Sequence, residues 1–170
     1  MNEKKESAHR NNHMPLNEDA YEVFILSSPL PFPFNFAVHT WVVTNNKGKT
    51  NRWEVWQRKN AGAVSWEHVH NNLFALFTGM NVFYILTKKR FQSTVIYKMK
   101  GDKGSQAQKL ISFIENKVSV YPFKKTYRYV PGPNSNTFTQ WIINQMDAKE
   151  VKLPWNAFGK GYVRHLSSTK

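Results

Sequence analysis

The chain has 170 residues, no cysteine, 15% aromatic residues and a formal net charge of +13. This length fits one domain with a substantial hydrophobic core, and the aromatic content argues against a disordered protein. The lack of cysteine excludes a disulfide scaffold, a cysteine-ligated zinc site and a thiol enzyme.

The positive charge is concentrated in the second half of the chain. Residues 88–170 contain 16 of the 24 Lys and Arg residues but only 4 of the 11 Asp and Glu residues. Such a surface can attract nucleic acid, anionic lipid or an acidic partner. It can equally be an ordinary solvated surface, which is the interpretation we favour.

The two ends of the chain are polar. Residues 1–20 lack an apolar segment and predict a flexible leader, not a signal peptide. The longest nearly apolar run, residues 73–86, is too short to cross a bilayer. We therefore expect a soluble cytoplasmic protein with one domain over residues 21–165 and a frayed tail over residues 166–170.

The first predicted strand is YEVFIL, residues 21–26. In the segment SSPLPFPFNF that follows, residues 27–36, three prolines at alternate positions remove backbone donors and predict an edge or connecting segment. We expect its three Phe side chains to attach it to the core of its own domain.

The middle of the chain predicts further strands. Residues 37–44 and 51–57 are β-rich and flank NNKGK, which favours a β-hairpin. Residues 63–77 predict a mixture of loop and helical turn. Residues 81–86 and 91–99 predict a second strand pair.

Helical spacing begins after residue 104. Ser105 is a plausible N-cap for a helix over residues 105–118, which repeats an apolar residue at positions Leu110, Ile111, Ile114 and Val118. Residues 121–130 predict another extended segment. The last helix follows PGPNSNTF and has an apolar face of Phe138, Trp141, Ile142 and Ile143. Strands followed by helices predict an α+β domain, in which an antiparallel sheet packs against two main helices.

Histidines supply two candidate sites. His68 and His70 form an H-x-H pair that could share a metal, but no acidic third ligand lies at suitable spacing, so we expect no metal site. His39 lies within an apolar strand and must find a buried partner or line a cleft. If Trp41 pairs with Glu54 across the hairpin, Glu54 lies diagonally opposite His39 and can orient its imidazole as a general base.

The start of the last helix is a third candidate. Asn134 or Ser135 can cap it, and Thr137 with Gln140 fits a capping box. A hydroxyl here would also lie beside unpaired backbone N–H groups that can bind an oxyanion, provided that a base is near. We assign Ser135 to the cleft and capping to Asn134 or Thr137.

Five motifs resemble one bacterial family. They are HTWVV at 39–43, RWEVW at 52–56, YPF at 121–123, PGPNSNTF at 131–138 and LPWNAFGKGY at 153–162. Together they are similar to the domain-of-unknown-function family numbered 3750, over about residues 36–162. Phe158 and Gly161 replace the Ile and Asp that are usual in the family, and the family implies no activity.

The order of His39, Glu54 and Ser135 also resembles the permuted papain-like proteins, which include the NlpC-type and lecithin retinol acyltransferase-like groups. In these proteins a strand histidine and a polar residue on the next strand precede a cysteine at a helix start. The similarity implies a permuted papain-like fold with Ser135 at the position of the cysteine.

Two functions are therefore open. The first is hydrolysis of an amide or ester, or acyl transfer, with Ser135 as nucleophile, His39 as base and Glu54 as the orienting residue. The substrate would contact Asn134, Asn136 and Trp41. The second is a non-catalytic module that binds a small molecule, peptide or glycan in the same cleft. We expect no cofactor, and we place nucleic acid and anionic lipid behind these ligands.

Overall fold

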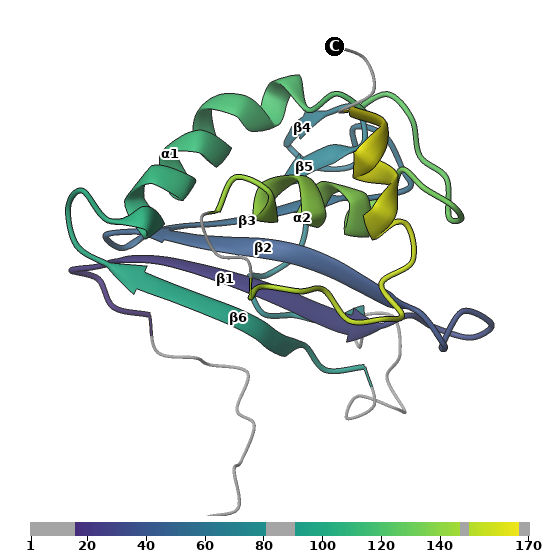
Figure 1. The fold of residues 1–170 in the computed structure, drawn as a ribbon, viewed down its shortest axis with the longest axis horizontal. Coiled ribbons are helices and arrows are strands. Elements are labelled where there is room, and N and C mark those ends of the chain that lie inside the picture. Colours follow the sequence, from purple (N-terminus) through teal and green to yellow (C-terminus); the bar gives the residue numbers. More distant parts are fainter. Residues whose placement is uncertain (1–15, 81–90, 147–149, 167–170) are drawn as a thin grey trace, which may run out of the picture.

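The computed structural model describes residues 16–80, 91–146 and 150–166, which form one antiparallel sheet with helices on one side (Figure 1). The predicted strand at 81–86 lies outside the described residues, as do residues 1–15 of the expected leader. The described end of that leader belongs to the domain, since the backbone N–H of Asn17 donates to Glu22 and its carbonyl accepts from Asn45.

Within the described residues the sheet has six strands in the order β4-β5-β3-β2-β1-β6, and every neighbouring pair is antiparallel. The predicted antiparallel sheet is thus confirmed. The strands are β1 (Tyr21–Pro29), β2 (Val38–Asn46), β3 (Lys49–Val55), β4 (Val64–Trp66), β5 (Val69–Asn71) and β6 (Thr94–Gly101).

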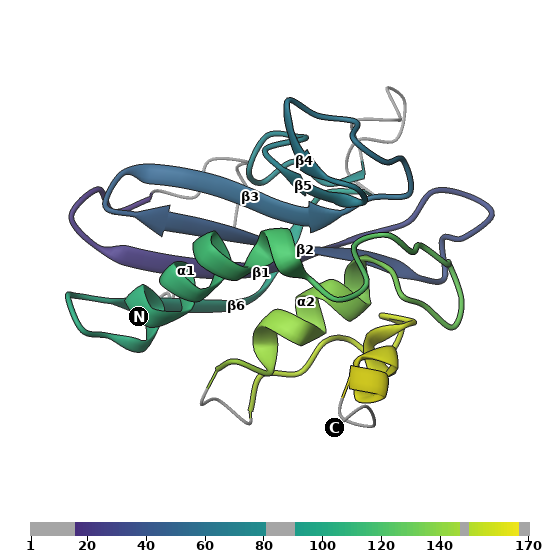
Figure 2. The same ribbon diagram turned by 90° about the horizontal axis from the view of Figure 1, so that it is seen from above.

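Two α-helices cover one face of the sheet, as predicted (Figures 1 and 2). Helix α1 (Gln106–Lys117) begins at its predicted N-cap Ser105, whose hydroxyl accepts from the backbone N–H of Gln108. Helix α2 is Ser135–Ile143. Short 3-10 helices follow each of them, η2 (Val118–Val120) and η3 (Lys160–Leu166).

Successive side chains of a strand point to opposite faces of the sheet, and here both faces carry an apolar layer. Val42 and Trp53 face the helices and pack in one cluster with Ile114 and Phe138. The intervening residues face the other side, where Phe24, Leu26, Trp41 and Val43 pack against Leu76 and Phe77 from the loop after β5. Both faces of the central strands are therefore covered, and a polar side chain on either face is buried.

Three local predictions are wrong. Residues 63–77 contain the short strands β4 and β5 instead of a helical turn, because the turn at Glu67 lets this segment fold back and extend the sheet. Residues 121–130 are not extended throughout, because turns at 122–125, closed by backbone hydrogen bonds from Lys124 to Tyr121 and from Thr126 to Phe123, interrupt them. The three Phe residues of the segment between β1 and β2 are exposed instead of packed in the core, with exposed fractions of 81%, 43% and 58% for Phe32, Phe34 and Phe36.

The start of α2 is fixed by Asn134. Its side-chain oxygen accepts from the backbone N–H groups of Asn136 and Thr137, and the Thr137 hydroxyl accepts from the backbone N–H of Asn134. The capping box therefore begins at Asn134, three residues before the box that the sequence suggested. The side-chain amide of Asn134 also donates to the carbonyls of Tyr129 and Phe158, so this residue connects the helix to two loops.

Gly159 lies against this cap. Its φ is +91°, and a Cβ built on it would lie 2.4 to 2.8 Å from the three terminal side-chain atoms of Asn134. We predict that Gly159→Ala lowers the free energy of unfolding by about 2–4 kcal/mol, from backbone strain and displacement of the cap together. Gly104→Ala is the matched control, because its φ is +84° and no atom lies within 4 Å of the added carbon. Urea denaturation measures both, and equal losses would contradict a role for contact with Asn134.

Candidate functional site

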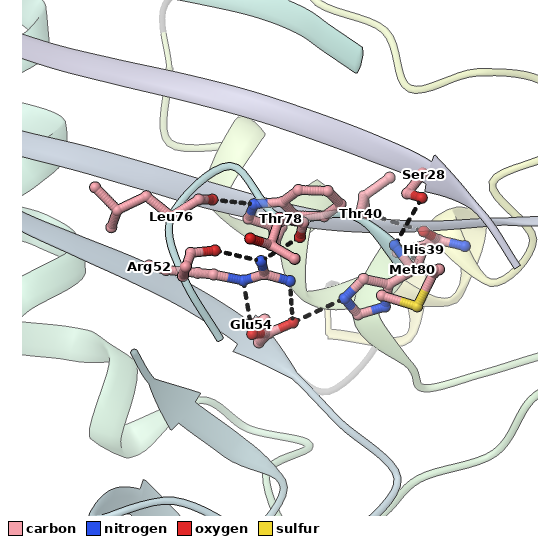
Figure 3. Close-up of polar contacts among 11 residues, drawn as sticks. Ser28, His39, Thr40, Arg52, Glu54, Leu76, Thr78 and Met80 are labelled. Carbon is pink, nitrogen blue, oxygen red and sulfur yellow. Dashed lines mark hydrogen bonds and ion pairs between the residues drawn. The ribbon is translucent and has the colours of Figure 1, made fainter. Parts of the chain in front are cut away.

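The register of the β2–β3 hairpin places His39 near Glu54. Val42 pairs with Trp53, so continuing the ladder by one residue sets Trp41 opposite Glu54, as the sequence suggested. His39 and Glu54 are then diagonal neighbours on the face that points away from the helices. Their side chains meet there, with His39 Nε2 at 2.9 Å from Glu54 Oε2 (Figure 3).

The carboxylate of Glu54 is shared with Arg52, two residues earlier on the same face. Arg52 Nε lies 2.7 Å from Oε1 of Glu54, and its terminal nitrogen Nη2 lies 2.9 Å from Oε2 (Figure 3). Both side chains are fully buried. Nη2 donates a hydrogen bond to Oε2, and the Nε–Oε1 contact is an ion pair, so both carboxylate oxygens of Glu54 lie against the guanidinium.

The loop after β5 holds the other side of the guanidinium. Arg52 Nη1 donates to the carbonyl oxygens of Ala75 and Thr78, at 2.8 and 2.6 Å. The guanidinium carbon lies 4.3 Å from the centre of the Trp41 ring, and Trp41 Nε1 donates to the Leu76 carbonyl. Trp41, which we expected to contact a substrate, is fully buried and holds this arginine in place.

Arg52 is the residue of this network that we did not predict. The sequence carries a signal for it, because Arg52 and Glu54 are two apart on a strand and therefore share a face. A buried carboxylate requires a cationic partner, and Arg52 is the cation whose side chain lies on the same face of β3 as Glu54.

The network sets the charge of its two titratable members. Burial alone would raise the pKa of Glu54, but the charge and hydrogen bonds of Arg52 and the contact with His39 lower it, so Glu54 is ionised. Burial lowers the pKa of His39 by more than its contact with Glu54 raises it, so the imidazole is neutral at pH 7. A neutral His39 donates from Nε2–H to Glu54, which leaves the lone pair on Nδ1. Nδ1 has no hydrogen-bond partner in the described parts of the chain.

A pocket opens at the end of the sheet where β2 begins. We call it the end pocket; its cavity volume is about 420 Å³. Its walls come from the segment between β1 and β2, from Trp56 and Gln57 after β3, and from the loop before α2. Most of its wall residues are aromatic or aliphatic, and His39 and Ser135 are among its polar ones.

The three polar residues at the start of α2 have different roles. Asn134 is the N-cap, as described above. Asn136 is held by the Thr40 hydroxyl, which donates to its side-chain oxygen, and its amide donates to the carbonyls of Val38 and Phe158. Ser135 is the first residue of the helix, is 4% exposed, and its hydroxyl makes no hydrogen bond to any described residue. Only Ser135 is left with a polar side chain that a ligand could engage.

Ser135 and His39 line one pocket but reach it from different sides of the sheet. Thr40 points toward α2, so its neighbour His39 points to the opposite face, where Glu54 lies. Across the described residues, no hydrogen bond joins Ser135 to His39. The structure thus brings His39 and Glu54 into contact and leaves Ser135 as a separate polar group of the same pocket.

The H-x-H pair is held by hydrogen bonds within the protein. His68 Nδ1 lies 2.9 Å from the Trp56 carbonyl, and His70 lies between the Ser65 hydroxyl at 2.8 Å and the Arg58 carbonyl at 3.0 Å. Over residues 16–80, 91–146 and 150–166, no group of three or more His, Asp and Glu side chains could hold a metal ion. None of the helices in these ranges is long and apolar enough to span a bilayer.

Comparison with known proteins gives one match. Searches of the curated proteins and of the solved structures each find no match. A family model described as "Protein of unknown function (DUF3750)" matches residues 21–162, which include the whole sheet, both α-helices and every residue of the end pocket. The chain therefore belongs to the DUF3750 family of proteins of unknown function.

Proposed function

We propose that this protein is a binding module for a small apolar molecule, which it holds in the end pocket. The observation that carries the proposal is the pocket itself. Its volume of about 420 Å³ lies within the usual range for small-molecule sites, and its walls are mainly Phe, Tyr, Trp, Pro and aliphatic side chains. Walls of this kind favour an apolar ligand over a glycan or a charged peptide.

The polar groups of the pocket define one end of that ligand. The Ser135 hydroxyl can donate or accept a hydrogen bond, and a neutral His39 offers an acceptor at Nδ1. Asn134 and Asn136 also line the pocket, but their side-chain amides are engaged with the backbone and with Thr40. A ligand with one hydroxyl, carbonyl or acid group on an apolar body matches this arrangement.

The pocket predicts saturable binding of a neutral aromatic probe such as N-phenyl-1-naphthylamine, followed by its fluorescence. Ala37 lines the pocket and is 7% exposed, so Ala37→Phe fills part of the cavity. We expect this variant, and the milder Ala37→Leu to a smaller degree, to weaken binding by about tenfold or more.

Val64→Phe is the control, since Val64 is exposed on β4 and does not line the pocket. Thermal unfolding confirms that each variant folds. Equal affinity of the wild type and both Ala37 variants for the probe would contradict binding in the end pocket.

A second candidate function is acyl transfer, that is, hydrolysis of an ester or amide. It is favoured by a neutral His39 oriented by Glu54 in the same pocket as a serine hydroxyl at a helix start. Ser135 Oγ would attack the acyl carbon, its proton would pass to His39 Nδ1 and then to the leaving group, and water would release the acyl group. The chain order of these residues is that of the permuted papain-like proteins, which also supports this candidate.

The oxyanion would have to be held mainly by the backbone N–H of Ser135. The N–H groups of Asn136 and Thr137 already donate to the Asn134 side chain. The reaction also requires Ser135 and His39 to approach each other from the two faces of the sheet. For these two reasons we place acyl transfer second.

A fluorophosphonate probe separates the two functions. If Ser135 is a nucleophile, the probe modifies it. The Ser135→Ala variant is then not labelled, although it still binds N-phenyl-1-naphthylamine. Ser65→Ala is the control, because the Ser65 hydroxyl also contacts an imidazole, that of His70. For a binding module we expect no labelling that depends on Ser135. If mass spectrometry detects the probe on Ser135, acyl transfer is the function instead.

A further inference from the structure

Large apolar side chains are exposed around the mouth of the end pocket. Six of the eight such side chains on the described residues are found there, with exposed fractions from 43% to 81%. We call them the aromatic rim: Phe32, Phe34, Phe36, Tyr129, Val130 and Trp155. A cluster of exposed large apolar groups on one part of a surface is unusual and marks an interaction site.

Ring contacts connect four of the six rim residues, namely Phe34, Phe36, Tyr129 and Trp155. Phe34 stacks on Tyr129 with ring centres 5.5 Å apart, and it also contacts Phe36 at 6.4 Å. Phe158 then links Phe36 to Trp155, at 6.0 and 6.4 Å. The rim thus joins three segments that are distant in the sequence, and the first two extend at the same end of the sheet in both ribbon views (Figures 1 and 2).

Two of these three segments, residues 121–136 and 151–164, are basic. Residues 29–37, 121–136 and 151–164 contain six Lys or Arg residues and no Asp or Glu. Among these cations, Lys125, Arg128, Lys152 and Arg164 are exposed, and Lys125 is near enough to Glu67 to interact with the charge of that carboxyl. Arg128 lies between two residues that line the pocket, and Lys152 lies three residues before Trp155. Exposed aromatics and exposed cations therefore occur together on these two segments.

We propose that the aromatic rim docks the protein on the surface of a bilayer that contains anionic lipid. Phe and Trp side chains insert at the boundary between headgroups and acyl chains, while Lys and Arg side chains stay among the anionic headgroups. The side chains of the rim and the cations beside it supply both parts of this interaction. Docking in this orientation places the mouth of the end pocket against the lipid.

Single-stranded nucleic acid is the other polymer that aromatic and basic side chains bind. It requires open ring faces on which bases can stack. In the aromatic rim, Phe34 and Tyr129 stack on each other, and Phe36 and Trp155 each contact the Phe158 ring edge to face. Val130 and the prolines of the segment offer a base no ring face at all. These features favour a lipid surface.

Vesicle flotation tests the proposal with the full chain. The probes are vesicles of phosphatidylcholine alone and vesicles with about one-third phosphatidylglycerol. We expect binding to the anionic vesicles and weak binding to the neutral ones. The double variant Phe32→Ala/Trp155→Ala should reduce binding to anionic vesicles by at least about tenfold, while Val64→Ala, an exposed apolar residue on β4, leaves it unchanged.

Two double charge-reversal variants, one on the segments that carry the rim and one elsewhere in the molecule, test whether the cations beside the rim cause the preference for anionic lipid. Arg128→Glu/Lys152→Glu should abolish the preference for anionic vesicles, because these two exposed cations lie close to rim residues in the chain. Lys49→Glu/Lys103→Glu makes the same change of net charge on exposed residues at the start of β3 and in the turn before α1, and it should leave the preference in place. Equal losses from both pairs, or no binding of the wild type to anionic vesicles, would overturn the proposal. Binding of a single-stranded oligonucleotide that depends on Phe32 and Trp155, without vesicle binding, would also overturn it. The proposed pocket ligand is tested separately by the soluble probe, so either idea can fail alone.

Discussion

The carboxylate of Glu54 is the group on which the arrangement of the site depends. It is fully buried and is held by Arg52 on one side and His39 on the other. A buried charge is tolerated only when it is paired and hydrogen-bonded, and removing one member of such a pair costs about 3–5 kcal/mol. Because Arg52 also binds two carbonyls of the loop after β5, this one carboxylate connects the hairpin to the loop that covers it.

The same pairing decides what His39 can do. Arg52 already compensates the charge of Glu54, so the imidazole does not need to be protonated to satisfy its neighbour. His39 stays neutral, fixed in one tautomer, with Nδ1 as its remaining polar atom. On the other face of the sheet, Asn136 and the cap at Asn134 bring α2 against the start of β2 and against the segment around Phe158. The end pocket forms where these two polar networks meet.

The sequence was sufficient for the parts of the fold that local rules govern. The turn signal predicted the β2–β3 hairpin but left its register open, with the pairing of Trp41 and Glu54 as the condition for a His39–Glu54 contact. Periodicity with a cap residue predicted α1 from Ser105. Tertiary contacts decided the rest. No local pattern shows where Phe34 and Phe36 lie, because their rings contact loops more than 90 residues away in the chain. Likewise, the separation of Ser135 from His39 by the sheet follows from the side on which α2 packs.

The Arg52–Glu54 pair keeps His39 neutral and in one tautomer, and measuring the charge and tautomer of His39 tests this central claim most directly. Nitrogen-15 NMR of the imidazole, titrated from neutral pH downwards, measures both. We expect a neutral ring with the proton on Nε2 at pH 7, and protonation only below pH 6.5, the ordinary pKa of histidine. The pKa of His39 is lower in the folded protein than in the unfolded chain, so the unfolded chain binds the proton first as the pH falls. Below pH 6.5, His39 therefore lowers the free energy of unfolding. An imidazolium at pH 7, or a proton on Nδ1, would contradict the account.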